Sequence, residues 1–119
     1  MFGGRAAEYI NSRDWPELSA GTIRLQPWLS MKSEVSQALR NGMTTKCGVR
    51  RNAVKLNELI SLIDRLIDQV GRANPLIASR IIATAALARE ESRGGHFRED
   101  FQQEADKAVS SYLTYDRLT

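Results

Sequence analysis

Apolar side chains recur along the chain at the spacing of amphipathic helices. The clearest pattern lies between residues 52 and 71, where apolar positions follow one another at steps of three and one. These positions are Leu56, Leu59, Ile60, Ile63, Leu66, Ile67 and Val70. Asn52 is a suitable N-cap, and Gly71 is a suitable residue to end the segment. The pattern therefore predicts an amphipathic helix that buries one stripe.

Two weaker helical patterns precede this segment. A short helix is predicted at the start of the chain, and its apolar face carries Phe2, Ala6, Ala7 and Ile10. Residues 11–21 are expected to form a linker, because they contain Pro16 and Gly21. Apolar anchors in and after this linker, expected to pack on something, are Trp15, Leu18 and Trp28.

A helical pattern returns at Leu29 and is expected to be interrupted by Gly42 and ended by Gly48. Its apolar positions are Met31, Val35, Ala38 and Leu39.

The most apolar helix is predicted from Asn74, its N-cap, to about Ser92, with Pro75 at the first helical position. Its apolar residues fall on two adjacent faces, one with Ile77, Ile81, Ala85 and Ala88, the other with Ala78, Ile82 and Ala86. Such an alanine-rich helix is expected to be central and closely packed, and Gly94–Gly95 is expected to end it. After Phe101 the tail is polar, with a last apolar patch at Val109, Tyr112, Leu113 and Leu118.

The fold class predicted from these patterns is all-α. No range alternates with the period of a strand, and a connection of a few residues between the second and third helices makes these two antiparallel neighbours. We expect a three-helix antiparallel bundle, similar to a spectrin repeat, preceded by a short N-terminal helix. The expected division is 1–21, a short helix and linker, and 22–119, a three-helix domain with a polar tail.

Composition narrows the functional classes. The chain has 119 residues, enough for one domain, and a net charge of +3. No apolar stretch is long enough for a membrane span, and the N-terminus lacks the apolar core of a signal peptide. The basic surplus forms no stripe, so nucleic acid is not expected as a partner. A single cysteine, Cys47, excludes an internal disulfide and suggests a cytoplasmic location.

Catalytic motifs are not found in the sequence. There is no glycine-rich dinucleotide fingerprint, no phosphate loop and no metal-ligand spacing. His96 is the single histidine, so a Cys/His catalytic pair would need Cys47, which is better interpreted as a small buried hydrophobe. We therefore predict no catalytic, cofactor-binding or metal-binding residue in this chain.

The segment 90–101 differs from the rest because charged residues surround two glycines. Glycine allows positive φ, and arginine forms forked pairs with carboxylates. One interpretation is a helix C-cap with surface charges. The other is a docking loop, or part of an anion site, whose interface candidates are Arg93, His96, Arg98, Glu99 and Asp100.

Residues 92–100, Ser-Arg-Gly-Gly-His-Phe-Arg-Glu-Asp, resemble a Ser-Arg-Gly-(Ala/Gly/Cys)-His-x-Arg-x-Asp motif. That motif belongs to the C-terminal helical domain of the succinate dehydrogenase/fumarate reductase flavoprotein family, which includes the L-aspartate oxidases. Residues 1–7 are similar to the family's Val-Phe-Gly-x-Arg-Ala-Ala helix, which leaves the flavin domain. Residues 43–51 and 112–114 resemble stretches of the aspartate oxidases in the same order.

The resemblance implies a role for this chain as a non-catalytic domain that packs on and stabilises a flavin-binding domain, in cis or as a separate chain. It implies that the parent enzyme uses FAD to oxidise L-aspartate to iminoaspartate in de novo NAD synthesis. It also implies that residues 1–21 lead from a flavin domain that is absent here, and that the family's FAD and substrate ligands lie upstream. On this interpretation the side chains of Arg93, His96 and Arg98 are expected to be exposed in this chain, because their partners belong to the rest of the enzyme.

Other interpretations stay open. The family often has proline soon after the motif's aspartate, where this chain has Phe101-Gln102-Gln103. The chain could therefore be the same domain from a succinate dehydrogenase or fumarate reductase paralogue. It could also be an independent helical protein-interaction module, or form a homodimer through exposed apolar surface.

Overall fold

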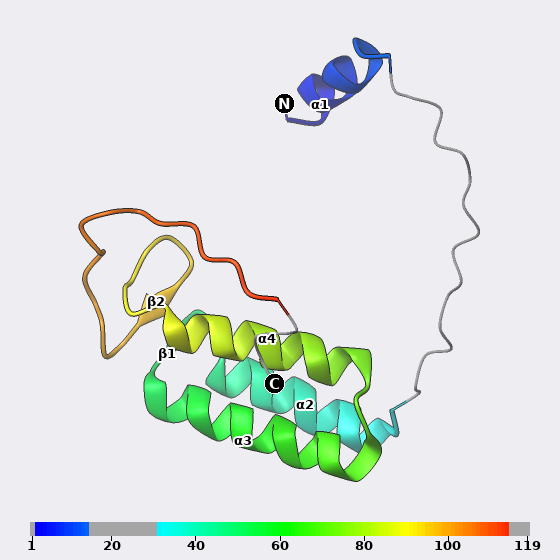
Figure 1. Cartoon of the computed structure of the whole chain (residues 1–119), viewed down its shortest axis with the longest axis vertical. Coiled ribbons are helices and arrows are strands. Elements are labelled where there is room, and N and C mark those ends of the chain that lie inside the picture. Colours follow the sequence, from blue (N-terminus) through cyan, green and yellow to red (C-terminus); the bar gives the residue numbers. More distant parts are fainter. Residues whose placement is uncertain (1, 15–30, 115–119) are drawn as a thin grey trace.

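The computed structural model describes residues 2–14 and 31–114 of the chain, which form four helices and two very short strands (Figure 1). In chain order these elements are α1 (Phe2–Asn11), α2 (Ser33–Lys46), β1 (Arg50–Arg51), α3 (Ala53–Val70), α4 (Asn74–Ala88) and β2 (Phe97–Arg98). No helix in these two ranges is long and apolar enough to cross a membrane.

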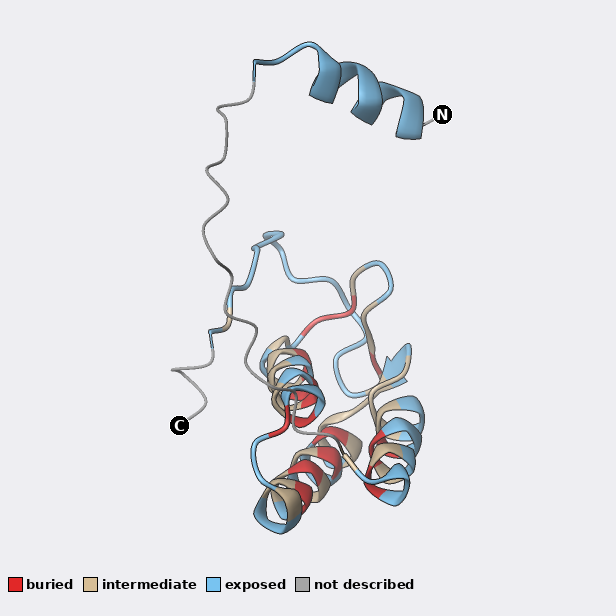
Figure 2. Cartoon of the chain, turned by 90° about the vertical axis from the view of Figure 1, so that its right-hand side faces the viewer, coloured by how far each residue is buried: buried red, intermediate tan, exposed pale blue. Residues whose placement is uncertain are grey.

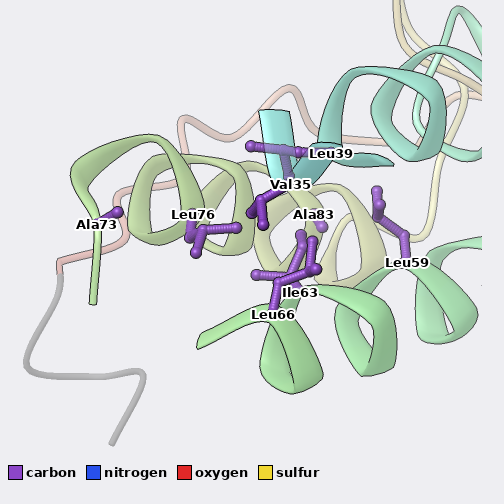
Figure 3. Packing of buried hydrophobic residues seen from close by; sticks show 8 residues of the cluster. All are labelled: Val35, Leu39, Leu59, Ile63, Leu66, Ala73, Leu76 and Ala83. Atoms are coloured by element: carbon purple, nitrogen blue, oxygen red, sulfur yellow. The ribbon is translucent and has the colours of Figure 1, made fainter. Parts of the chain in front are cut away.

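Helix α3 is the centre of the fold, because it packs on both α2 and α4. Its predicted stripe is confirmed: Leu56, Leu59 and Ile63 are fully buried, and Leu66 is nearly so. Leu59, Ile63 and Leu66 meet side chains from α2 and α4 in one core (Figure 3). The buried members of that core are Val35, Leu39, Leu59, Ile63, Leu66, Ala73, Leu76 and Ala83.

The expected central position of α4 is wrong, and its buried side coincides with neither of the two apolar faces described from the sequence. Its buried side carries Leu76, Ser79, Ala83 and Ala86, whereas Ile82 is half exposed. A helix that is apolar on nearly every side has no marked stripe, so its sequence does not reveal which side is buried. The clear stripe of α3 is what identifies the central helix.

Gly42 does not interrupt α2, contrary to the expectation. The helix runs through it, and Gly42 is buried against α3. A Cβ at this position would lie 2.9 Å from Leu62 Cδ2 and 3.0 Å from Leu59 Cδ1. The missing side chain therefore allows α2 and α3 to approach closely.

The predicted boundaries of α3 are confirmed. The Asn52 side chain accepts a hydrogen bond from the Lys55 N–H at 2.9 Å, and Gly71 ends the helix with a φ of 84°. Helix α4 begins close to the expected residue, with Pro75 in its first turn. It ends at Ala88, however, and residues 89–92 have left the helix before the glycine pair is reached.

The prediction of a purely helical chain also needs correction. Strands β1 and β2 form a parallel pair, with Arg50 opposite Phe97 and Arg51 opposite Arg98. Two-residue strands have no room for an alternating pattern, which is why the sequence did not indicate them. The antiparallel three-helix arrangement stays a prediction. The expected linker anchors Trp15, Leu18 and Trp28 lie outside the described residues, and so does Leu118 of the predicted tail patch.

Helix α1 is exposed along the whole length for which side chains are described (Figure 2). Tyr9 and Ile10, two of its larger apolar residues, are about half exposed. The domain division at residue 21 stays a prediction.

Candidate functional site

The segment that follows α4, residues 89–101, is called the motif loop below. It leaves the helix, reverses direction at Gly94–Gly95, and returns as β2 beside β1. The reversal is closed by backbone hydrogen bonds between Arg93 and His96, of 2.8 and 3.1 Å. Gly94 has a φ of 58°, a conformation that side chains with a Cβ rarely adopt. The loop thereby joins the end of α4 to the connection between α2 and α3.

Arg98 is the most deeply buried charged residue of the loop, with 1% of its surface exposed. Its Nη1 donates to the carbonyl oxygens at the end of α4, those of Ala86, Leu87 and Arg89, at 3.0, 2.8 and 3.1 Å. A cation is favourable there, because the last carbonyls of a helix lack intrahelical donors and carry the negative end of its dipole. Arg98 therefore caps α4 with its side chain.

The other side of the Arg98 guanidinium forms a fork with Asp100. Nε and Nη2 donate to the two carboxylate oxygens at 2.8 and 2.9 Å. Asp100 Oδ2 also accepts the N–H of Ala53, the first residue of α3, at 2.8 Å. The hydrogen bonds from Arg98 hold the pKa of Asp100 well below its usual range and raise the pKa of Arg98. One ion pair thus joins the C-terminus of α4 to the N-terminus of α3.

Glu99 and Asn52 form a second connection between the loop and α3. Asn52 Nδ2 donates to Glu99 Oε2 at 2.8 Å while its Oδ1 caps the helix. Arg50 and Lys55 lie 3.2 and 3.6 Å from the same carboxylate. The Asn52 hydrogen bond, followed by the Lys55 charge, lowers the pKa of Glu99. The acidic end of the motif therefore lies at the start of α3, where the helix dipole favours negative charge.

Glu91 and Arg93 fix the chain that follows the loop. Glu91 is buried, and its carboxylate accepts Arg93 Nε at 2.9 Å and the Ala105 N–H at 3.1 Å. Arg93 also donates to Glu104 and to the Ala105 carbonyl, at 2.7 and 2.8 Å. The Ala105 hydrogen bond is the main cause of a lowered pKa for Glu91. These contacts hold the start of the tail against the loop.

His96 lies inside the loop with its Nε2 3.1 Å from the Arg89 carbonyl oxygen. Burial lowers the pKa of His96, and the nearby charges of Arg51, Arg89 and Arg98 lower it further. A neutral imidazole with Nε2 protonated suits this position, because that tautomer donates to the carbonyl.

All five interface candidates take part in contacts within the motif loop or to α3, namely Arg93, His96, Arg98, Glu99 and Asp100. Arg93 in addition joins the loop to the tail. The expectation that Arg98 is exposed and without partners is wrong, because α4 and Asp100 use all of its nitrogen atoms. Arg93, Glu99 and Asp100 keep between 27 and 30% of their side chains exposed. Their role at a domain interface stays a prediction.

Sequence reasoning missed the part played by Ser92. Its hydroxyl accepts the Arg98 N–H at 2.8 Å and donates to the Phe101 carbonyl oxygen at 2.8 Å. The one available signal was its place as the first residue of the motif. A small hydroxyl residue beside two glycines is typical of local side-chain-to-backbone bonding.

The side chains of the motif loop hold the ends of α3 and α4 and the start of the tail in position. Within residues 2–14 and 31–114, no group of three histidine, cysteine or acidic side chains is placed to hold a metal ion. These ranges also contain no glycine-rich turn between a strand and a helix of the kind that holds the pyrophosphate of a dinucleotide. The described residues do not fit FAD, and we assign no step to it. Cys47 is half-buried, and burial raises the pKa of its thiol.

Comparison with known proteins agrees with the motif. Residues 65–117 match the family described as fumarate reductase flavoprotein C-term. The L-aspartate oxidase of Caulobacter vibrioides is 39% identical over 113 residues, which are 95% of this chain and 21% of that protein. The chain belongs to the succinate dehydrogenase/fumarate reductase flavoprotein family. Its similarity is to the C-terminal part of these flavoproteins.

Other members of this flavoprotein family match at lower identity. The L-aspartate oxidase of Mesorhizobium japonicum is 36% identical over 84% of the chain and 18% of its own length. A subunit of the fumarate reductase (CoM/CoB) of Methanothermobacter marburgensis is 29% identical over 60% of the chain. The chain spans about a fifth of the length of the first of these curated relatives, 21% of the Caulobacter oxidase.

Proposed function

We propose that this chain is the non-catalytic helical C-terminal domain of an FAD-dependent L-aspartate oxidase-like enzyme. In this proposal it packs on the flavin-binding domain and stabilises it, in cis or as a separate chain. Residues 1–21 lead from the flavin domain, and 22–119 form the three-helix antiparallel unit. The parent enzyme oxidises L-aspartate to iminoaspartate for de novo NAD synthesis in the cytoplasm.

The observation that carries the proposal is similarity to an L-aspartate oxidase along 95% of the chain. The geometry of the motif loop supports a packing role. Arg98 and Asp100 use their charges on helix ends within the chain, so they stiffen the loop. Stiffening leaves the outward edges of Arg93, Glu99 and Asp100 in fixed positions. A surface that is ordered before docking loses less conformational entropy when it binds.

A fumarate reductase-type parent is the second candidate. The match to the Methanothermobacter fumarate reductase (CoM/CoB) favours it. It covers 60% of the chain, however, against 95% for the Caulobacter oxidase. The packing role is the same in both cases, and the substrate of the parent enzyme differs.

Binding to a flavin domain is the direct test. The Caulobacter oxidase would be expressed without the part that this chain matches, and retained flavin would show that the remainder is folded. Calorimetric titration with this chain should give a saturable complex with one chain per flavin domain. The oxidase's own C-terminal part is the positive control. Binding of that control without binding of this chain would contradict the proposal.

A further inference from the structure

The two short strands, β1 and the β2 strand of the motif loop, differ in what lies along their outer edges. On β2, the edge turned away from β1 is closed by the Ser92 hydroxyl. That hydroxyl accepts the Arg98 N–H at 2.8 Å and lies 3.2 Å from the Arg98 carbonyl oxygen. No further strand can pair with β2 on that side without displacing Ser92.

Among the described residues, nothing pairs with the outer edge of β1. The ladder to β2 uses the carbonyl oxygens of Val49 and Arg51, which accept the N–H groups of Phe97 and Glu99 at 3.2 and 2.8 Å. Backbone groups alternate along a strand, so the N–H and C=O of Arg50 point away from β2. Within residues 2–14 and 31–114, neither group has a hydrogen-bond partner. Within the described part of the chain, β1 therefore presents one donor and one acceptor without a partner.

Two solvent-exposed apolar residues lie close to β1 in the sequence. Val49, which precedes β1, is 66% exposed, and Val54, in the first turn of α3, is 68% exposed. The Arg50 side chain is 76% exposed. An exposed strand edge flanked by apolar residues is a template for pairing with another segment.

Arg51 indicates which charge a partner at this edge should carry. Its Nε is buried without a hydrogen-bond partner, and it forms no ion pair with any described residue. The positive charge of Arg51 instead acts to lower the pKa of His96 and of Cys47. A half-buried guanidinium without a carboxylate is unfavourable unless a partner supplies one.

We propose that the outer edge of β1 receives an extended segment of the flavin domain that carries a carboxylate. Its backbone pairs with the N–H and C=O of Arg50, its apolar side chains cover Val49 and Val54, and its carboxylate pairs with Arg51. This mode of binding is strand addition to a sheet edge. The inference rests on the proposed function, because that function supplies the partner.

Amide hydrogen exchange in the complex with the flavin domain tests the pairing. In the free chain the Arg50 N–H should exchange without protection, and in the complex its exchange should slow by about tenfold or more. The variants Arg50→Pro and Arg50→Ala separate backbone from side chain, because both lack the guanidinium and proline alone also lacks the N–H. Arg50→Pro should bind about tenfold more weakly than Arg50→Ala. Arg51→Gln should also weaken binding and reduce its salt dependence.

The outcomes separate this inference from the proposed function. If the chain binds the flavin domain but the Arg50 N–H stays unprotected, the inference is wrong and the proposed function stands. If the chain does not bind at all, both fail. Protection that appears in the free chain as its concentration rises would assign the edge to a second copy and overturn the inference. The exchange measurement needs no variant, so it decides the matter even if Arg50→Pro does not fold.

Discussion

Replacing Arg98 with alanine should destabilise this chain strongly. The substitution removes a side chain that is 1% exposed and deprives the carbonyl oxygens of Ala86 and Leu87 in α4, and of Arg89 just after it, of a donor. It also removes both hydrogen bonds to the Asp100 carboxylate, which keeps the Ala53 N–H. Removing one partner of a buried ion pair costs about 3–5 kcal/mol. Because Asp100 is 30% exposed, we expect a loss of stability at the lower end of that range, about 3 kcal/mol.

Thermal melting followed by circular dichroism measures this loss. A cost of this size should lower the melting temperature by more than about 10 °C in a domain of this length. Arg98→Lys should fall between the wild type and Arg98→Ala, because lysine keeps the charge at α4 but cannot form the fork with Asp100. Arg50→Ala is the matched control from the paired strand. Its side chain is 76% exposed, so its melting temperature should be nearly unchanged.

The reasoning would be refuted if Arg98→Ala and Arg50→Ala melted alike. That result would mean that the α4 carbonyls and Asp100 are satisfied equally well by water. A lower affinity for the flavin domain with unchanged melting would instead restore Arg98 to the exposed interface role that the sequence suggested.

Three further predictions concern the core and pH. Ile63→Ala, at a fully buried position of α3, should lower the free energy of unfolding by about 2–4 kcal/mol. Asp64→Ala should lower it by about 0–1 kcal/mol, because the ion pair of Asp64 with Arg80 is partly exposed. Urea unfolding measures both values, and equal losses would contradict the assignment of the buried stripe. Gly42→Val should lower the free energy of unfolding by about 2 kcal/mol, because the new side chain would collide with Leu59 and Leu62. An unchanged urea midpoint would show that α3 can shift to accommodate the larger residue. Stability should fall as pH drops below about 6.5, because the unfolded chain then binds a proton that folded His96, with its lowered pKa, does not. His96→Gln should flatten melting temperature between pH 7 and 5, and an unchanged slope would assign the loss to other groups.

The sequence was informative where a periodic pattern coincided with burial. The stripe of α3 follows a helical period and is buried as expected, and its Asn52 cap follows from side-chain chemistry. The same reasoning failed for α4, whose apolar residues surround the helix, and for β1 and β2, which are too short for a pattern. Gly42 looked like an interruption because the close approach of α3 is a tertiary contact.

The motif loop shows a different limit of prediction. Its composition indicated forked arginine–carboxylate pairs, and the Arg98–Asp100 fork is present. The sequence did not reveal that this pair lies inside the chain, because burial of Arg98 depends on where α4 ends. That end precedes the glycine pair, at Ala88. Sequence reasoning therefore identified the residues and their chemistry but not the surface on which they act.

The most direct test of the packing role is the release of FAD from the flavin domain on heating. Flavin fluorescence rises when FAD leaves the protein, so its midpoint reports the stability of the flavin domain. The Caulobacter oxidase lacking its matched part would be heated alone, with this chain, and with its own C-terminal part. We predict that this chain raises the release temperature in a concentration-dependent way, as mass action requires for a partner that binds the folded state. A release temperature that rises with the oxidase's own part but not with this chain would contradict the account.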